Sequence, residues 1–269
     1  FTHNVESEIL ERHWQVAKSL AMKVVWKNQY HKMCAFEQKT LSEFDAVVAV
    51  SERDRDFFAD KWGIAHCRTI PTGVDTDFFT YQTPQSDLQV VFCGSMDWMA
   101  NIDAVEYFFD KVWRRIHNQI PEARMKVVGR SPPEALVNRI CGQAKEWQFT
   151  GFVDDVREHI GGAAAFVIPL RVGGGTRIKA FEAMAIGSPV VSTSIGIEGL
   201  PVVDGTHFLA ADEPHIMADK VVSLLKNEEL RTSISQAARL LVEKEYSYKR
   251  AARKFEEICI DAAYQGSGR

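Results

Sequence analysis

The sequence predicts an α/β protein in which helices cover both faces of a parallel sheet. From residue 89 onward, short apolar runs alternate with longer stretches of helical periodicity, which is typical of such a sheet. The apolar runs are rich in Val, Ile and Phe without polar alternation, as expected for strands buried on both faces. The 269 residues are 46% hydrophobic and 25% charged, a composition that excludes disordered and fibrous proteins.

The first part of the chain is predicted to be mostly helical. Residues 5–41 contain neither Gly nor Pro, which favours one long helix. The β-branched, apolar run at 44–50 predicts a buried strand, and Ser51 with Asp54 three residues later predicts the start of a helix. A further strand is expected at 67–70, before the Pro-Thr-Gly sequence of residues 71–73.

The alternation becomes regular after a polar, linker-like segment at residues 82–87. The predicted strands are 89–93, 125–128, 147–150, 164–170, 189–192 and 206–210. The predicted helices include 101–118, 132–145, 154–160, 176–185 and 247–264. We therefore expect a partial N-terminal domain over 1–80, a Rossmann-like domain over 88–245 and a C-terminal crossover helix over 246–269.

Three consecutive glycines carry the strongest local signal for a binding site. Gly173, Gly174 and Gly175 lie between an apolar strand and a helix with good helix formers. Glycines let the backbone approach a ligand closely, and the N-terminus of the helix presents unpaired N–H groups. The spacing matches neither a P-loop nor a dinucleotide-binding motif. The junction therefore predicts a phosphate site that belongs to neither an ATPase nor a dehydrogenase.

The first turn of that helix adds charged groups to the predicted site. Thr176 is placed to cap the helix or bond a phosphate oxygen, and Arg177 and Lys179 bring two cations where the helix dipole alone favours acids. Glu182 shares a helix face with Lys179 and is placed to accept hydrogen bonds from ribose hydroxyls. The alternative is a glycine-rich turn followed by a Lys179–Glu182 surface pair.

Several function classes are disfavoured by composition. A formal net charge of −4 argues against a nucleic-acid-binding protein. The longest uncharged apolar runs are far shorter than the roughly 20 residues that span a bilayer. The five cysteines are scattered without a CxxC pair, and the histidines show no metal-ligand spacing. We therefore expect neither a disulfide framework nor a metal site.

A basic segment in the first predicted helix leaves two interpretations open. Every formal charge between residues 12 and 36 is positive, and Trp14, Trp26 and Tyr30 are interleaved with these charges. On one continuous helix, an apolar arc opposes the cations; it consists of Trp14, Met22, Val25, Met33 and Phe36. The segment is either an interfacial helix on anionic lipid or a packed surface helix with a solvated basic face.

Six short motifs resemble retaining GT-B glycosyltransferases of the family 4 type. In the second part of the chain these are EAMAIGSPVV at 182–191, TGFVDD at 150–155, GSMDW at 94–98 with Asn101, and IGIEGL at 195–200. In the first part they are AVSE at 49–52 and IPTGVD at 70–75. The resemblance covers the chain from His3 to the last helix. It implies a GT-B fold in which roughly the first hundred residues of the N-terminal domain are missing.

The resemblance implies transfer of a sugar from a UDP- or GDP-sugar to a glycan or lipid-linked acceptor, with retention and without metal or cofactor. It further implies a role in polysaccharide biosynthesis at a cytoplasmic location. The basic segment at 12–36 leaves peripheral membrane contact open, and the strand edges of a partial first sheet leave a homo-oligomer open. Two alternatives are a nucleotide-sugar-binding fragment without activity and a GT-B-fold nucleotide-sugar epimerase.

Roles in phosphate and ribose binding follow from the resemblance position by position. The family has two glutamates eight apart; the second falls on Glu182, which is expected to bind ribose, and the first falls on Gly174. Ser95 follows Gly94 where members often carry Arg, so phosphate neutralisation is expected to rest on Arg177 and Lys179.

Roles around the base and the donor sugar are implied in the same way. Arg130, Phe152 and Val153 lie at strand ends where the family seats the base. His3 matches a histidine that approaches the donor sugar, with a frayed terminal residue as the alternative.

Overall fold

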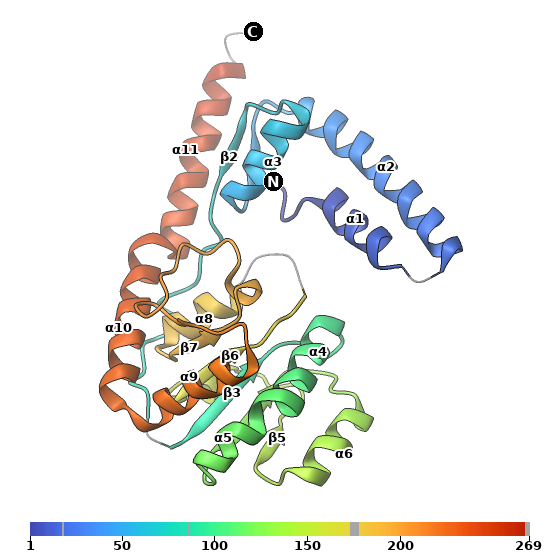
Figure 1. Cartoon of the computed structure of the whole chain (residues 1–269). Coiled ribbons are helices and arrows are strands. Elements are labelled where there is room, and N and C mark those ends of the chain that lie inside the picture. The colour runs from blue at the N-terminus through green and yellow to red at the C-terminus, as the bar shows by residue number, and fades with distance from the viewer. Residues whose placement is uncertain (18, 86, 173–177, 267–269) are drawn as a thin grey trace. The chain divides into compact units, whose positions relative to one another are not determined.

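The computed structural model describes residues 1–17, 19–85, 87–172 and 178–266 and divides them into two compact units (Figure 1). Of the described residues, unit 1 holds 1–73 and those from 248 onward, and unit 2 holds those of 74–172 and 178–247. The predicted domain boundaries near residues 80–88 and 245 remain predictions.

Unit 2 contains the parallel sheet that the sequence predicts. Its six strands run in the order β5-β4-β3-β6-β7-β8, and every neighbouring pair is parallel. The strands are β3 (Gln89–Cys93), β4 (Arg124–Val128), β5 (Trp147–Phe149), β6 (Ala165–Ile168), β7 (Val190–Ser192) and β8 (Leu209–Ala210). The middle of β3 and all of β6 are buried, which explains their continuous apolar sequence.

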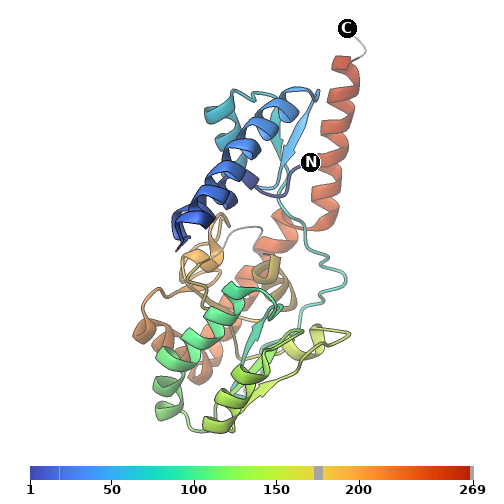
Figure 2. The same ribbon diagram turned by 90° about the vertical axis from the view of Figure 1, so that its right-hand side faces the viewer.

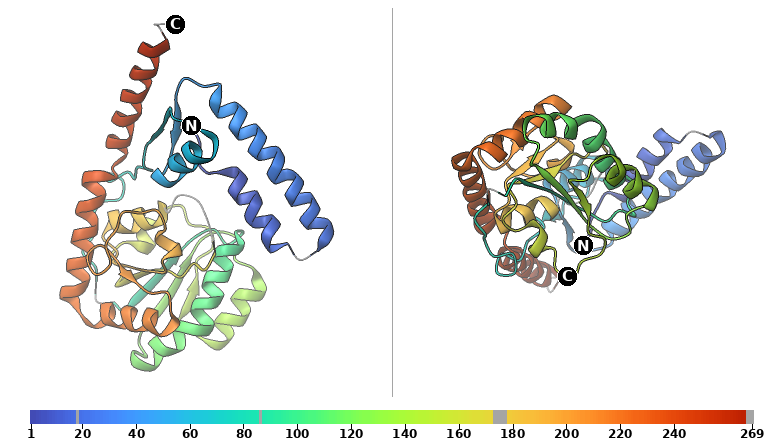
Figure 3. Two further views of the ribbon diagram at one scale, coloured as in Figure 1. Left: turned by 45° about the horizontal axis from the view of Figure 1, so that its top comes forward. Right: turned by 90° about the horizontal axis from the view of Figure 1, so that it is seen from below.

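Helices cover the sheet of unit 2 in two layers (Figure 3). The π-helical segment η1, α5 and α9 contact one another on one face; α8 contacts α7, and α10 packs on α8. The elements are α4 (Met99–Tyr107), η1 (Phe108–Trp113), α5 (Arg114–Gln119), α6 (Glu134–Gln143), α7 (Arg157–Ile160), α8 (Ile178–Ile186), η2 (Ile195–Ile197, 3-10), α9 (Pro214–Lys226) and α10 (Glu228–Glu245). The predicted helix at 101–118 is thus a longer run of three segments.

Unit 1 is smaller and mainly helical (Figure 2). Its sheet consists of the parallel strands β1 (Val47–Ala49) and β2 (Cys67–Thr69), and the backbone N–H of Thr2 donates to the Val48 carbonyl oxygen (2.8 Å). The helices are α1 (Glu6–Val16), α2 (Leu20–Ser42), α3 (Glu52–Trp62) and α11 (Tyr248–Gly266). The Ser51 hydroxyl accepts a hydrogen bond from the Asp54 N–H (3.1 Å), which confirms the predicted start of α3.

The prediction of one long helix over residues 5–41 is wrong. Ala17 is extended, and the Ser19 side chain accepts from the Met22 N–H (3.1 Å), so α2 begins afresh at Leu20. The Glu37 carboxylate of α2 accepts the N–H groups of Glu6 (2.8 Å) and Ser7 (3.2 Å) at the start of α1. This long-range cap favours a helical hairpin over one straight helix.

The hairpin also rearranges the apolar arc that was expected on one helix. The Trp14 ring lies 6.0 Å from the Tyr30 ring, between α1 and α2, and Met33 is half-buried. These two side chains therefore do not share an open face with Met22, Val25 and Phe36. Among the helices that the structure describes, none combines the length and apolar character needed to cross a membrane.

Candidate functional site

The topology of unit 2 places a crevice at the carboxyl ends of β3 and β6. The chain continues from β3 to β4 on one side of this pair and from β6 to β7 on the other. In open parallel sheets, ligands bind where the strand order reverses in this way. The loops that follow β3 and β6 therefore border the candidate site. Helix α8 follows the loop after β6 in the sequence.

Two glycines let the strand ends meet closely at this edge. The Gly94 N–H donates to the Val128 carbonyl oxygen (2.9 Å), and Gly129 has a φ of +154°. A Cβ atom on Gly129 would overlap the Gly94 carbonyl oxygen. The backbones of the loops after β3 and β4 are thus in direct contact at Gly94 and Gly129.

Lys179 is tied to the end of β3 through Asn101. The Lys179 Nζ donates to the Asn101 Oδ1 (2.9 Å) and lies 4.9 Å from the centroid of the Phe92 ring. Asn101, at the start of α4, donates from its Nδ2 to the Ser95 carbonyl oxygen (2.8 Å). A Cβ atom on Gly94 would lie 2.9 Å from both the Asn101 amide and the Lys179 Nζ. The lysine therefore lies against the glycine, at the crevice.

Glu182 provides a half-buried carboxylate one turn further along α8. Burial raises its pKa, and the positive charge of Lys179 lowers it in part. Burial also raises the pKa of the Cys93 thiol to about 11; Lys179 opposes this rise and Glu182 adds to it. Cys93 is thus a protonated thiol at neutral pH and does not serve as a nucleophile.

Ser95, Asp97 and Arg130 form a polar cluster on the neighbouring loops. The Ser95 hydroxyl donates to the Asp97 Oδ1 (2.7 Å) and accepts from the Arg130 Nε (2.9 Å), and Arg130 pairs with Asp97 at 3.2 Å. The hydrogen bond from Ser95 and the charge of Arg130 lower the pKa of Asp97. A ligand that engages Arg130 must share it with this carboxylate.

A second arginine braces the loop that follows β6. Arg171 pairs with Asp103 of α4, Nε to Oδ2 at 3.1 Å, and its guanidinium lies 4.8 Å from the centroid of the Tyr107 ring. The Tyr107 hydroxyl donates to the Asp212 carbonyl oxygen (3.4 Å), just after β8. These contacts connect α4 to the loops that follow β6 and β8.

Large apolar side chains are exposed where strands β3 and β5 lead into their loops. Trp98 is 62% exposed and Phe152 is 73% exposed, whereas Val153 packs against the core of unit 2. An exposed aromatic ring beside a polar cluster offers a stacking surface for a planar group such as a nucleobase.

The structure brings together five of the residues singled out in the sequence. Gly94, Ser95, Arg130, Lys179 and Glu182 lie around the carboxyl ends of β3 and β4 and the start of α8. Phe152 and Val153 follow β5, the edge strand. The predicted residues that lie outside the described part of the chain are Gly173, Gly174, Gly175, Thr176 and Arg177.

His3 belongs to unit 1, where it is exposed with its ring 4.9 Å from that of Phe1. Sequence reasoning did not assign a role to Asn101. Its position could have indicated one, because it follows Gly94 by seven residues and falls in the first turn of the helix after β3.

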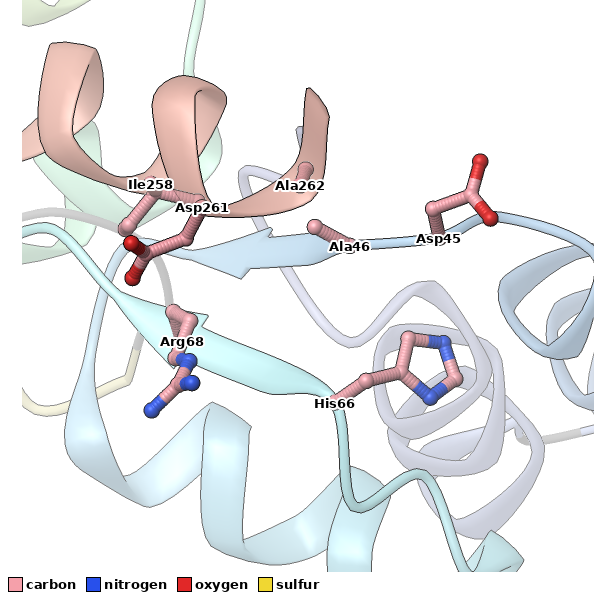
Figure 4. Close-up of a pocket in the computed structure, with 7 residues that line it drawn as sticks. All are labelled: Asp45, Ala46, His66, Arg68, Ile258, Asp261 and Ala262. Atoms are coloured by element: carbon pink, nitrogen blue, oxygen red, sulfur yellow. The ribbon is translucent and has the colours of Figure 1, made fainter. Parts of the chain in front are cut away.

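Unit 1 contains a small hollow of about 30 Å³ beside α11 (Figure 4). It is lined by Asp45, Ala46, His66, Arg68, Ile258, Asp261 and Ala262. A hollow of this volume holds about one water molecule, and it adjoins the residues that precede β1 and β2 rather than the strand ends where ligands bind. Among the described residues, no three His, Cys, Asp or Glu side chains form a group that could hold a metal ion.

Two known proteins are similar to this chain in sequence. An uncharacterized 44.6 kDa protein from the cps region of Klebsiella pneumoniae is 23% identical over 82% of this chain and 58% of its own length. The phosphatidyl-myo-inositol mannosyltransferase of Mycobacterium leprae is 28% identical over 54% of this chain and 40% of its own length. This chain therefore spans less than two thirds of these relatives.

The fold is of the GT-B type. A mutant of S. aureus TarM, crystallised with fondaparinux, alpha-GlcNAc-glycerol and UDP, superposes with a TM-score of 0.69 at 16% identity, over 84% of this chain and 46% of that one. The model of the family described as glycosyl transferases group 1 matches residues 87–227, which is more than half of the chain and includes the whole sheet of unit 2. The chain belongs to the glycosyl transferases group 1 family.

Proposed function

We propose that unit 2 binds a nucleotide sugar at the carboxyl ends of β3 and β6, and that the protein transfers this sugar to a glycan or lipid-linked acceptor with retention. One observation carries the proposal. The Lys179 ammonium is held at the start of α8 against Gly94, by an asparagine that also bonds the loop after β3. A cation fixed at the start of a helix is suited to bind a diphosphate.

In this proposal the diphosphate lies between the loop after β3 and the start of α8. Lys179 and Arg177 supply positive charge, and the glycines at 173–175 with Thr176 supply backbone and hydroxyl donors. These groups stabilise the negative charge that grows on the departing nucleoside diphosphate when the bond to the anomeric carbon breaks. The protein's own cations do this work, so we infer a metal-independent reaction.

The nucleoside is placed by groups on either side of the phosphates. Glu182 accepts hydrogen bonds from ribose hydroxyls; a carboxylate that is already half-buried loses less hydration on binding them than an exposed one. Phe152 and Val153 seat the base with Arg130, and Gly94 and Ser95 border the donor sugar. UDP in the TarM crystal favours uridine as the base, with guanosine as the alternative. The assignment of His3 to the donor sugar is a proposal that rests on the family resemblance alone.

The acceptor class rests on the relatives. One is named a mannosyltransferase of phosphatidyl-myo-inositol, and another belongs to a cps region. We infer a lipid-linked or glycan acceptor and a role in polysaccharide biosynthesis.

Calorimetric titration of the chain with UDP and GDP tests the site. Lys179→Ala should weaken nucleoside diphosphate binding about tenfold or more, the scale of one charge-assisted hydrogen bond. Lys145→Ala is the matched control, because Lys145 is exposed and precedes β5 at the opposite edge of the sheet. Binding should be unchanged by EDTA. Equal affinities for wild type and Lys179→Ala would contradict the site, and a strict requirement for a divalent metal would contradict the metal-independent reaction.

A product assay separates transfer from the two alternatives. An epimerase converts the nucleotide sugar without an acceptor, whereas a transferase needs one. A binding fragment consumes no nucleotide sugar under either condition. Nuclear magnetic resonance spectra of the products with and without a panel of acceptors distinguish the three, and the configuration of the new linkage tests retention.

We further propose that the α1–α2 hairpin contacts an anionic membrane surface. At the start of α2, Leu20 and Val24 are 83% and 69% exposed, and Lys23 and Lys27 lie beside them. No acidic residue occurs between Arg12 and Phe36. Apolar side chains with flanking cations and no acids suit a lipid surface of negative charge, such as the cytoplasmic leaflet.

Co-sedimentation with vesicles tests this contact. The chain should bind vesicles that contain phosphatidylglycerol and should dissociate from them in high salt. It should not bind vesicles of pure phosphatidylcholine. Lys23→Glu with Lys27→Glu should abolish binding, whereas Lys145→Glu should not. Absence of binding to anionic vesicles, or equal binding by the charge-reversed variant, would contradict the proposal.

A further inference from the structure

Asn101 is a buried polar residue whose two amide ends reach different elements. It is 8% exposed and lies in the first turn of α4. Its Oδ1 accepts from the Lys179 Nζ of α8 (2.9 Å), and its Nδ2 donates to the Ser95 carbonyl oxygen in the loop after β3 (2.8 Å). An ammonium can only donate and a carbonyl can only accept, so the orientation of the amide is fixed by its partners.

We propose that Asn101 is a positioning residue that holds the Lys179 ammonium toward the phosphate site without placing a negative charge on it. The inference rests on the proposed function, in which Lys179 binds the donor diphosphate. Asn101 itself does not need to touch the donor.

The surroundings explain why a residue is needed for this task. A lysine side chain has four rotatable carbon–carbon bonds, and ordering it on binding has a large cost in side-chain entropy. The bond to Asn101, with the Phe92 ring 4.9 Å away, orders Lys179 before the ligand arrives. A lysine ordered in advance binds more tightly, because part of the ordering cost is already met.

The chemistry of the holder matters as much as its position. An aspartate has nearly the same shape as asparagine and would hold the lysine, but its carboxylate would neutralise the ammonium. The asparagine oxygen carries no net charge, so Lys179 still attracts a diphosphate. The space is confined, since a Cβ on Gly94 would lie 2.9 Å from the amide and from the Lys179 Nζ. Shape and charge can therefore be tested separately.

The experiment compares UDP with uridine, which lacks the phosphates, on the whole chain. Calorimetry measures UDP affinity and ligand-observed nuclear magnetic resonance measures uridine affinity for wild type, Asn101→Asp, Asn101→Ala and Lys179→Ala. Asn138→Asp is the control, because Asn138 is exposed on α6 and the substitution adds the same charge away from the site. If the chain prefers GDP, GDP and guanosine replace the two probes.

Asn101→Asp should weaken UDP binding about tenfold or more and change uridine binding less than twofold. Asn101→Ala should weaken UDP binding by a smaller factor, and combining it with Lys179→Ala should add nothing to the loss from Lys179→Ala alone, because both changes remove one interaction. Asn138→Asp should bind UDP like the wild type.

Three outcomes overturn the inference. Unchanged UDP affinity in Asn101→Asp, with a loss in Lys179→Ala, refutes the role of Asn101 and leaves the proposed function standing. Equal losses for UDP and uridine show a structural role only, and fully additive losses in the double variant show that Asn101 does not act through Lys179. Unchanged UDP affinity in Lys179→Ala refutes the proposed phosphate site itself. If Asn101→Asp melts at a much lower temperature than wild type, the comparison of Asn101→Ala with the double variant decides.

Discussion

At the scale of single residues, two glycines shape the candidate site because they carry no side chain. Gly94 leaves the space that Asn101 and Lys179 occupy, and Gly129 lets its loop touch the Gly94 carbonyl. A larger residue at position 94 would displace the Asn101 and Lys179 side chains, and one at position 129 would collide with the Gly94 backbone. Gly129 therefore permits the backbone contact between the loops after β3 and β4, whereas Gly94 leaves room for the two polar side chains.

The first prediction concerns Gly129→Ala. Its φ of +154° is strained for alanine, and the added Cβ would overlap backbone that cannot turn aside. We expect a loss of unfolding free energy of about 2–4 kcal/mol, measured by urea denaturation, together with weaker UDP binding. Gly142→Ala in α6 is the control, because nothing lies within 4 Å of its added Cβ. It should be neutral or slightly stabilising, and equal losses in both variants would disprove the explanation.

The second prediction concerns Glu182→Gln and its dependence on pH. Burial raises the pKa of Glu182, so the folded state favours the protonated carboxyl, and this contribution to stability is lost as the pH rises through the folded pKa. At pH 7 the amide should therefore raise the melting temperature, by about 1–3 °C. The difference should shrink as the pH falls toward 4, because the carboxyl of the unfolded chain also takes up its proton near the ordinary pKa of about 4.3. The variant should nevertheless bind UDP more weakly, since it loses an acceptor for ribose.

Calorimetric melting curves from pH 4 to 8 measure this effect. A melting temperature at pH 7 that is lower in Glu182→Gln than in wild type would show that the carboxylate is stabilising, contrary to the sign expected from burial.

At the scale of elements, α8 is held firmly at its C-terminal end. Most of its residues are buried. The Arg239 guanidinium of α10 is only 13% exposed. It donates to the carbonyl oxygen of Ala185 in α8 and to those of Thr76 and Phe79 in the segment 74–85, which precedes β3. Arg157 also contacts this segment, because its guanidinium lies 3.7 Å from the centroid of the Phe78 ring. Residues 74–85 are thereby part of unit 2.

The third prediction is that Arg239→Met destabilises unit 2. Methionine keeps much of the apolar stem but leaves three carbonyl oxygens without their shared donor, which should cost about 2–3 kcal/mol. Urea denaturation followed by tryptophan fluorescence measures the loss. Arg115→Met, at an exposed position of α5, should stay within about 0.5 kcal/mol of wild type. Comparable losses in the two variants would mean that the carbonyl contacts of Arg239 contribute little.

At the scale of the whole molecule, the described sheets of the two units differ in size. Unit 2 has six strands with helices in two layers, whereas the described sheet of unit 1 has two short strands. The chain spans 58% and 40% of the length of its two relatives.

The fourth prediction is that this chain self-associates. The two described strands of unit 1 form an open sheet, and the strand edges of an open sheet favour pairing with another copy. Light scattering at several concentrations should detect an oligomer. A monomer at every concentration would contradict this prediction.

The sequence alone determined the features that arise from local pattern. The apolar runs identified the strands of unit 2, since a strand buried on both faces cannot carry polar side chains. The glycines, Lys179 and Glu182 marked the loop and helix after β6, because residues close in sequence show their spacing directly.

Only the tertiary structure decided the features that depend on distant partners. The break after α1 follows from Glu37, which caps a helix thirty residues before it. The Asn101–Lys179 bond joins residues 78 apart, and the bonds from Arg239 to Phe79 and Thr76 join residues 160 and 163 apart. Local sequence shows which groups can bond, but the pairing of β3 with β6 decides which of them meet, because that pairing brings the two loops to one edge of the sheet.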